Sequence, residues 1–322
     1  MVQFENKLRP KTLDEFIGQQ NLKDNLKIAI EAAKKRGECI DHVLLHGSPG
    51  LGKTTLANII AKEMNVNIKI TSGPALEKQG DIASIISNLE NHDVLFIDEI
   101  HRLKPVVEEV LYTAMEDFGI DIIIGKGPSA RNMRINLPHF TLIGATTKMS
   151  MLSSPLRGRF GNVFKLQFYT DDDIKQVILR SAAVLKCRIS ESASEILAKS
   201  CRNTPRIANR LLKRVRDYAD VNHESIIDND VLTNALMAIG IDKVGLDSTD
   251  RELLSIIIDK FGGGPVGLNT LAAATSEEQS TIEDIYEPFL IQAGFLERTS
   301  RGRLVTDKAY EHMGINSAKP LK

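Results

Sequence analysis

Short apolar runs alternate with helical stretches through the first half of the chain. The runs are almost continuous in apolar residues, which is typical of parallel strands whose two faces are both covered by helices. The expected strands are Val43–Leu45, Ile68–Ile70, Val94–Ile97, Phe140–Ile143 and Val163–Leu166. The pattern predicts an α/β domain over residues 1–169, built on a parallel sheet flanked by helices.

One segment of this domain follows a different pattern. Apolar residues take alternate positions over Ile120–Ile124 and again over Met133–Leu137, and turn-forming residues lie between them at Gly125–Pro128. This arrangement predicts a β-hairpin inserted into the α/β layer. The pattern leaves its role open between a decoration and a surface that faces a partner or substrate.

Beyond this domain the strand-like runs stop. Helical periodicity continues to about Ala238, so we expect residues 170–240 to form a small all-helical domain. Residues 241–322 carry three further helical stretches, the third over Glu277–Ile291, and then a hairpin around Ser300–Arg303. Three helices closed by a hairpin predict a winged-helix domain, which is a variant of helix-turn-helix.

Composition restricts the partners and the cellular compartment that we expect for this chain. The chain has 322 residues, 42% of them hydrophobic, and a net charge of −1, so any surface that binds nucleic acid must be a local patch. The three cysteines Cys39, Cys187 and Cys201 lie far apart without metal-ligand spacing, which suits a reducing compartment. Because no export signal and no apolar run of about 18 residues is present, we expect a cytoplasmic protein that does not enter a membrane.

A complete phosphate-binding loop occupies Gly47–Thr54, between an apolar run and an amphipathic stretch. Gly50 and Gly52 allow backbone N–H groups to turn toward an anion, and Lys53 reaches the β- and γ-phosphates. The hydroxyl of Thr54 can ligate Mg²⁺, and the helix that follows presents its positive N-terminus. The sequence therefore predicts a site for a nucleoside triphosphate.

Two carboxylates follow the apolar run Val94–Ile97. Phosphoryl transfer needs a carboxylate near the metal ion and a group that orients the attacking water. We expect Asp98 to serve the metal and Glu99 the water. Thr146, at the end of another apolar run, is a weaker candidate for contact with the γ-phosphate or the water.

Several arginines are candidates for contact with phosphates. Arg159, two positions after Arg157, can neutralise charge that develops at a neighbouring subunit's site, although two surface arginines are an equally weighted interpretation. Arg206 begins a helix with a basic stripe and can reach a bound nucleotide, whereas a charge run is usually a solvated face. The C-terminal hairpin carries arginines suited to phosphate contacts: Arg298, Arg301 and Arg303.

In this order, the elements resemble the RuvB family of AAA+ Holliday-junction branch-migration motors, over nearly the entire chain from about Leu8 to His312. The most specific stretches are Leu8–Pro10, Phe16–Gln19, Gly50–Thr55, Ile97–Leu103 and Thr204–Leu212. A further stretch, Glu287–Leu296, lies in the winged-helix part. It distinguishes this family from clamp loaders and AAA+ chaperones, which share only the first elements.

The resemblance implies an ATP- and Mg²⁺-dependent hydrolase. The nucleotide-binding residues that it implies are Leu8, Arg9, Ile17, Gly50, Gly52, Lys53, Thr54, Thr55, Glu116, Asp117, Phe118, Arg159, Tyr169 and Arg206. The implied catalytic residues are Lys53, Asp98, Glu99, Thr146 and Arg159, with Thr54 and Asp98 at the metal. In this assignment Thr146 is the first sensor, Arg206 the second sensor and Arg159 the finger that acts on the neighbouring subunit.

The resemblance also implies an assembly. We expect a homo-hexameric ring on duplex DNA at four-way junctions, with RuvA and RuvC as partners in recombination and repair. The hairpin at residues 120–137 matches the element that docks RuvA, and Arg298 and Arg303 match contacts to the DNA backbone.

Three positions depart from the family pattern. Ser48 replaces the usual proline in the loop, at a position that contributes only its backbone. Gly158 replaces the acid between the two arginines, which leaves the orientation of Arg159 open, and Asn203 replaces the glycine before Thr204.

The sequence leaves two other functional classes open. One is a clamp-loader-like ATPase whose client is a protein ring. The other is a nucleotide-gated DNA-binding regulator without motor activity, because winged helices are common in transcription factors.

Overall fold

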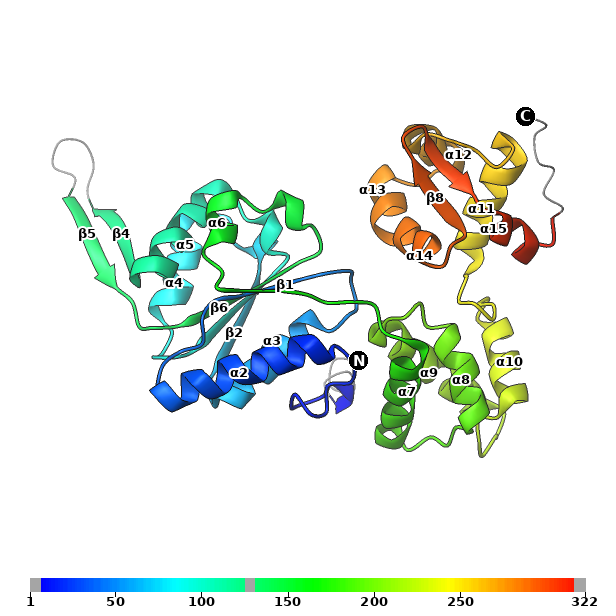
Figure 1. The fold of residues 1–322 in the computed structure, drawn as a ribbon, viewed down its shortest axis with the longest axis horizontal. Coiled ribbons are helices and arrows are strands. Elements are labelled where there is room, and N and C mark those ends of the chain that lie inside the picture. Colours follow the sequence, from blue (N-terminus) through cyan, green and yellow to red (C-terminus); the bar gives the residue numbers. More distant parts are fainter. Residues whose placement is uncertain (1–6, 125–130, 316–322) are drawn as a thin grey trace. The chain divides into compact units, whose positions relative to one another are not determined.

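The computed structural model describes residues 7–124 and 131–315 (Figure 1). These residues form two compact units. The first runs to Val177 and also includes Thr204–Arg206, and the second consists of Ile178–Asn203 and the chain from Ile207 onward.

The first unit is built on a five-stranded sheet in the order β2-β3-β6-β1-β7. The strands are β1 (Val43–His46), β2 (Ile68–Ser72), β3 (Val94–Asp98), β6 (Thr141–Thr146) and β7 (Asn162–Lys165). Every neighbouring pair is parallel, which confirms the predicted α/β class. The central strands β3 and β6 are almost wholly buried, whereas β2 and β7 are partly exposed because they form the sheet edges.

Helices cover both faces of this sheet. The longer ones are α2 (Gln20–Arg36), α3 (Lys53–Met64), α4 (Gln79–Ser87) and α5 (Pro105–Asp117). Figure 1 shows α2 and α3 on one face and α4 and α5 on the other. On the second face, Ile82 and Ile86 of α4 and Val107 and Leu111 of α5 pack into one buried cluster with strand residues. The carboxyl ends of the strands are thereby left free to carry a site.

Short elements complete the first unit. They are the 3₁₀ turns η1 (Gly73–Ala75), η2 (Ile100–Arg102) and η4 (Met149–Met151), and the helix α6 (Ser154–Gly158). Helix α6 begins where the hydroxyl of Ser153 accepts a hydrogen bond from the N–H of Leu156, which is an N-cap.

The predicted hairpin is present as β4 (Gly119–Ile124) and β5 (Arg131–Asn136). The strands are antiparallel, with Ile120 opposite Ile135, and the buried Ile120 ties the base of the hairpin to the core beside α5. The turn expected at Gly125–Pro128 lies outside the described residues.

The all-helical segment consists of α7 (Asp171–Leu185), α8 (Glu191–Lys199), α9 (Pro205–Val221) and α10 (Asn229–Ala238). In α9, the spacing predicts an apolar stripe of Ile207, Leu211 and Val215; Leu211 and Val215 are buried and Ile207 is half-buried. We refer to the part of this segment that lies in the second unit as the lid.

The C-terminal part of the second unit is a winged helix. It comprises α11 (Ser248–Phe261), α12 (Leu268–Thr275), α13 (Gln279–Thr281), the π-helical η5 (Ile282–Tyr286), α14 (Glu287–Gln292), β8 (Leu296–Thr299), β9 (Gly302–Val305) and α15 (Asp307–His312). The third helix is therefore not the continuous α-helix expected over Glu277–Ile291. The π segment shifts the helical register, so Ile282 is buried while Ile285 is 60% exposed.

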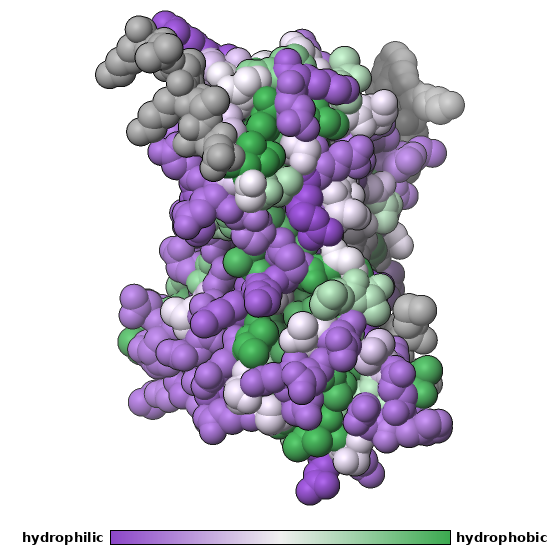
Figure 2. All heavy atoms as spheres, turned by 90° about the vertical axis from the view of Figure 1, so that its right-hand side faces the viewer, coloured by the Kyte–Doolittle hydropathy of each residue, from purple (hydrophilic) through white to green (hydrophobic). Residues whose placement is uncertain are grey.

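The surface of the second unit is mostly polar on the face shown in Figure 2. Hydrophilic residues cover most of this face, and apolar residues appear as separate groups. Across residues 7–124 and 131–315, no helix combines the length and apolar character needed to cross a membrane.

Candidate nucleotide-binding and hydrolysis site

The phosphate-binding loop connects β1 to α3. Gly50 and Gly52 have φ angles of 83° and 103°, which only glycine adopts readily. A Cβ atom on Gly52 would lie 3.2 Å from the ring of Phe16, and one on Gly50 would lie 3.1 Å from Cβ of Arg206. Both glycines are therefore required by conformation and by space, and α3 begins directly after them at Lys53.

The side chain of Lys53 folds back onto the loop. Its Nζ donates hydrogen bonds to the carbonyl oxygens of Gly47 at 2.7 Å and Ser48 at 2.9 Å. Ser48 thus contributes its backbone, as expected for a position where the side chain is free to vary. Burial lowers the pKa of Lys53 to about 8, with Asp98 opposing the shift and Arg206 adding to it. A bound phosphate would supply the negative charge that this ammonium lacks.

The predicted acidic pair lies at the carboxyl end of β3. Oδ1 of Asp98 accepts a hydrogen bond from the N–H of Glu99 at 3.0 Å. Glu99 has a left-handed φ of 48°, and its carboxylate forms an ion pair of 3.0 Å with Arg102 in η2. Arg102 was not a predicted site residue. The only sequence signal for it is its position three residues after Glu99, which a 3₁₀ turn brings onto the same side.

Thr146 ends β6 at the same edge of the sheet. It lies opposite His46 in the parallel register, and its carbonyl accepts a hydrogen bond from Gly47, so it adjoins the start of the loop. The side chain is buried, with Oγ1 2.9 Å from Nδ1 of His101. The strand order β3-β6-β1 thus brings Asp98, Glu99, Thr146 and the loop to one edge.

Tyr169 and Arg206 also belong to this part of the first unit. The hydroxyl of Tyr169 donates to the carbonyl of Leu51 at 3.1 Å, and the ring lies against Gly18. The N–H of Arg206 lies 3.4 Å from the carbonyl of Gly50. Two residues that follow the five strands in sequence are therefore brought to the loop itself.

The remaining residues implied for the base pocket are placed less uniformly. Leu8 is buried and Ile17 is half-buried near the loop's neighbour Phe16, whereas Arg9 is exposed. Arg9 lines a surface hollow together with Asn58 and Lys62 of α3. Thr54 and Thr55 occupy the first turn of α3, as the motif requires.

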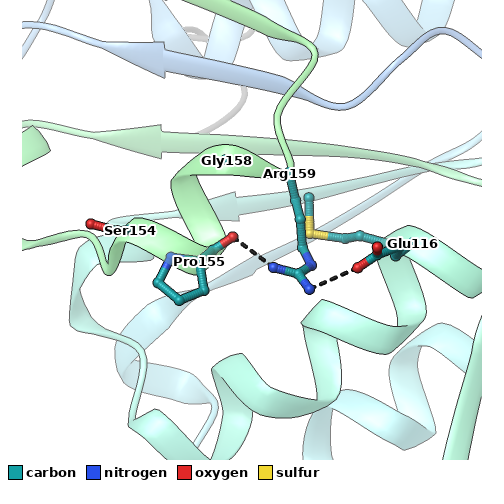
Figure 3. Close-up of a pocket in the computed structure, with 6 residues that line it drawn as sticks. Glu116, Ser154, Pro155, Gly158 and Arg159 are labelled. Atoms are coloured by element: carbon teal, nitrogen blue, oxygen red, sulfur yellow. Dashed lines mark hydrogen bonds and ion pairs between the residues drawn. The ribbon is translucent and has the colours of Figure 1, made fainter.

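Arg159 is held by α5 and α6 in a polar hollow (Figure 3). Its Nη2 forms an ion pair of 2.7 Å with Glu116, and its Nη1 donates to the carbonyl of Pro155 at 2.9 Å. Its Nε donates to the carbonyl of Tyr112 at 3.3 Å, and the guanidinium carbon lies 4.8 Å from the centre of that ring. The orientation that Gly158 left open is thus supplied by contacts elsewhere in the chain.

The two residues after Glu116 have other contacts. Asp117 forms an ion pair of 3.2 Å with Arg134 of β5, and the ring of Phe118 packs against that of His139 at a tilt of 44°, with ring centres 4.2 Å apart. The end of α5 therefore connects Arg159 with the base of the hairpin.

The wing arginines differ from each other. Arg298 is 55% exposed and forms an ion pair of 2.9 Å with Glu283. Arg303 is buried against the buried carboxylate of Glu287, and among the described residues its Nη2 has no hydrogen-bond partner. The exposed position expected for Arg303 is therefore not found, because the π segment and α14 place their acids under the wing.

A phosphate-binding loop after β1 of a parallel sheet, an acidic pair at the end of β3 two strands away, a helical lid and a winged helix define a AAA+ ATPase with an attached DNA-binding fold. Three family models match in succession. Residues 8–166 match the Holliday junction DNA helicase RuvB P-loop domain, residues 169–242 the RuvB AAA lid domain and residues 243–314 the RuvB C-terminal winged helix domain. The chain belongs to the RuvB family.

Individual relatives agree with this assignment. The chain is 59% identical over 308 residues to the Holliday junction branch migration complex subunit RuvB of Dehalococcoides mccartyi (strain CBDB1), covering 96% of this chain and 88% of that protein. It is similar to the structure of the Thermotoga maritima RuvB Holliday junction branch migration motor, with a TM-score of 0.88 and 53% identity over 96% of this chain and 99% of the other. A variant of the Thermotoga protein gives a TM-score of 0.89 with the same identity and coverage.

Proposed function

We propose that this chain is an ATP-driven motor that promotes branch migration of Holliday junctions. One observation carries the proposal: the similarity extends through the P-loop domain, the lid and the winged helix, rather than the ATPase part alone. The relatives with this arrangement are named as branch-migration proteins.

In this proposal the loop binds the triphosphate. The backbone N–H groups around Gly50 and Gly52 contact the phosphates, and Lys53 exchanges its two carbonyl partners for the β- and γ-phosphates. Leu8, Arg9, Ile17 and Tyr169 surround the base, and Arg206 contacts the phosphates.

Thr54 and Asp98 would hold Mg²⁺, because hydroxyl and carboxylate oxygens are the ligands that this ion prefers. The ion would supply charge neutralisation at the β- and γ-phosphates when bound. Once its ion pair with Arg102 is broken, Glu99 orients the attacking water. Thr146 contacts the γ-phosphate or this water.

The proposed assembly is a homo-hexamer on duplex DNA. Arg159 contributes to the site of the neighbouring subunit, together with Glu116, Asp117 and Phe118 beside its nucleotide. The β4–β5 hairpin docks RuvA, RuvC acts on the same junction, and the complex works in the cytoplasm, where bacterial DNA lies. Arg298 contacts the DNA backbone, whereas Arg303 supports the wing from within.

We also propose domain boundaries at 169/170 and 240/241, giving the ATPase domain, the lid domain and the winged-helix domain. The family models support these positions to within a few residues, because they meet between 166 and 169 and between 242 and 243.

The proposal is tested by mixing the purified chain with RuvA, ATP, Mg²⁺ and a labelled synthetic four-way junction. We expect ATP-dependent dissociation of the junction, which Lys53→Ala abolishes by removing nucleotide binding. Glu99→Gln should bind ATP but hydrolyse it about 10²–10⁴-fold more slowly. If DNA stimulated ATP hydrolysis but the junction stayed intact, branch migration would be refuted. In that case, release of a protein ring would identify a clamp loader. Nucleotide-dependent DNA binding without ATP turnover would identify a regulator.

A further inference from the structure

Arg202 connects the lid to the winged helix inside the second unit. It lies between α8 and α9, and its Nη2 forms ion pairs with Asp247 at 2.8 Å and Asp250 at 2.6 Å. Its Nε donates to the carbonyl of Gly245 at 2.9 Å, and its guanidinium carbon lies 4.6 Å from the centre of the Phe289 ring. One lid side chain therefore contacts Gly245 in the segment between α10 and α11, the start of α11 and helix α14.

This contact is buried and closely fitted. The side chain of Arg202 is 11% exposed and that of Asp250 is fully buried. The two aspartates also cap α11, because Asp247 accepts from the N–H of Asp250 and Asp250 accepts from the N–H of Asp247. A guanidinium can bridge two carboxylates and stack on a ring at once, which a lysine ammonium cannot.

The backbone at the joint is equally specific. Arg202 and Asn203 both have φ angles of 51°, in the left-handed region that few residues other than glycine and asparagine adopt. The amide oxygen of Asn203 accepts from Gln292 of α14 at 3.3 Å, so the residue that departs from the family glycine also reaches the winged helix. On the other side, a Cβ atom on Gly245 would lie 2.6 Å from the carbonyl oxygen of Ser200.

The chain passes directly from this joint to the nucleotide-binding loop. Asn203 belongs to the second unit, and the next three residues, Thr204–Arg206, cluster with the first. Arg206 adjoins Gly50, as described above. Arg202 and Arg206 are four residues apart, one engaged by the winged helix and the other by the loop that would hold the triphosphate.

We propose that Arg202 is a positioning residue of the motor, which fixes the winged helix to the lid so that displacement of Arg206 during nucleotide turnover moves the DNA-binding part. This inference rests on the proposed function. A packed joint held by ion pairs and hydrogen bonds is a physical means by which a shift at one site reaches another.

The test compares Arg202→Met with the matched control Arg216→Met. Methionine keeps an apolar stem against Phe289 and removes every N–H donor of Arg202. Arg216 is also a partly buried lid arginine, but it forms ion pairs with Asp217 and Asp220 of its own helix. We measure ATP hydrolysis without DNA, affinity for duplex DNA, and ATP hydrolysed per junction dissociated with RuvA.

We expect Arg202→Met to keep basal hydrolysis and to raise the ATP hydrolysed per junction about tenfold. Arg202→Lys should be intermediate, and Arg216→Met should match the parent chain. An unchanged ATP requirement in Arg202→Met would overturn the inference. If Arg202→Met does not fold, Arg202→Lys tests the inference instead, because lysine keeps the positive charge. More ATP hydrolysed per junction in Arg202→Lys would support the role of Arg202, and an unchanged amount would refute it.

A separate readout distinguishes failure of this inference from failure of the proposed function. If the parent chain does not dissociate junctions, the proposed function is wrong. Coupling between the nucleotide site and DNA binding can still be measured, as the ratio of the DNA affinity with a non-hydrolysable ATP analogue to the DNA affinity with ADP. We expect this ratio to fall toward one in Arg202→Met and to persist in Arg216→Met. An unchanged ratio in Arg202→Met would refute the joint by itself.

Discussion

The guanidinium group of Arg159 lies 2.7 Å from the carboxylate of Glu116 in the same chain. The arginine proposed to act on a neighbour's nucleotide is therefore oriented by its own subunit before any neighbour arrives. Its Nε and Nη1 donate to the carbonyls of Tyr112 and Pro155, so its position is set by α5 and α6 together.

Arg159→Ala should lower DNA-stimulated hydrolysis by about 10³–10⁵-fold, as expected when an arginine finger is lost. ATP binding should persist, because the phosphate-binding loop is intact. Steady-state kinetics and nucleotide-binding measurements check both points. Mixing Arg159→Ala with Lys53→Ala subunits should restore part of the activity at interfaces that pair an intact loop with an intact arginine, and the absence of any rescue would contradict a shared site.

Glu116→Gln should change the free energy of unfolding by no more than about 1 kcal/mol, because the Glu116 side chain of this ion pair is 64% exposed. It should nevertheless lower kcat several-fold by loosening Arg159. Position 158 offers a matched rescue: no atom lies within 4 Å of a Cβ placed on Gly158, so Gly158→Asp has room for a second carboxylate. The double variant should regain activity, and equal kcat values for Glu116→Gln and the parent would show that Glu116 does not position Arg159.

Local sequence predicts most of the fold, because almost continuous apolar runs, a glycine-rich loop and helical stripes each specify one element. The side-chain contacts that orient the proposed functional residues join positions far apart in the sequence. Glu116 and Arg159 are 43 residues apart, and Arg202 and Asp250 are 48 residues apart. Such pairs depend on how helices pack, so a single sequence offers no spacing rule for them.

The burial of Arg303 illustrates the same limit within one small domain. A hairpin tip rich in arginine predicts exposed cations, yet the acid opposite Arg303 comes from Glu287, at the end of a π segment. A π turn changes the face on which a side chain lies, and the helical periodicity of the sequence gives no sign of it.

The pKa of Lys53 makes ATP affinity depend on pH. In the free chain this pKa is lowered to about 8, whereas a bound triphosphate favours the charged ammonium and raises it. Affinity should therefore be highest below pH 8 and fall as pH rises through that value, by at most about tenfold per pH unit. Without ATP, the stability of the fold changes with pH in the opposite direction. Because the pKa of Lys53 is lower in the folded than in the unfolded chain, the fold is destabilised below about pH 8. This destabilisation decreases as pH rises from about 8 toward the pKa of the unfolded chain.

Titration calorimetry in buffers of different ionisation enthalpy measures the accompanying proton uptake, which should be about half a proton at pH 8. Lys62→Met is the control, because Lys62 is an exposed lysine of the same helix and its loss should leave the uptake unchanged. Binding without proton uptake near pH 8 would mean that Lys53 is fully charged before ATP arrives.

Arg102 should restrain Glu99 in the absence of a neighbouring subunit or DNA. Their ion pair is roughly half exposed, so breaking it costs about 1 kcal/mol or less, and Arg102→Met should raise basal hydrolysis about two- to threefold. The double variant Arg102→Met, Glu99→Gln should hydrolyse ATP as slowly as Glu99→Gln alone, because the carboxylate that Arg102→Met would release is absent. If Arg102→Met were as slow as Glu99→Gln, the arginine would instead be holding Glu99 in its working position.

Arg298 and Arg303 should respond differently to substitution, because one is exposed and the other buried. Arg298→Ala should weaken DNA binding and reduce the slope of log affinity against log salt concentration by about one. It should change the free energy of unfolding by no more than about 1 kcal/mol, because Arg298 is 55% exposed in its ion pairs with Glu283 and Glu287. Titrations at several salt concentrations measure this slope, and Arg301→Ala on the same hairpin tests whether the effect belongs to Arg298.

Arg303→Met should instead destabilise the winged helix by up to about 3–5 kcal/mol, because the carboxylate of Glu287, only 2% exposed, then keeps only its 4.0 Å ion pair with Arg298. Adding Glu287→Leu should recover most of this loss, since replacing a buried ion pair by apolar residues is often neutral. Thermal unfolding of the parent chain and of these two variants measures the effect. A reduced salt slope in Arg303→Met with unchanged thermal stability would place this guanidinium on the DNA, because a purely internal support cannot alter counterion release while leaving the fold intact.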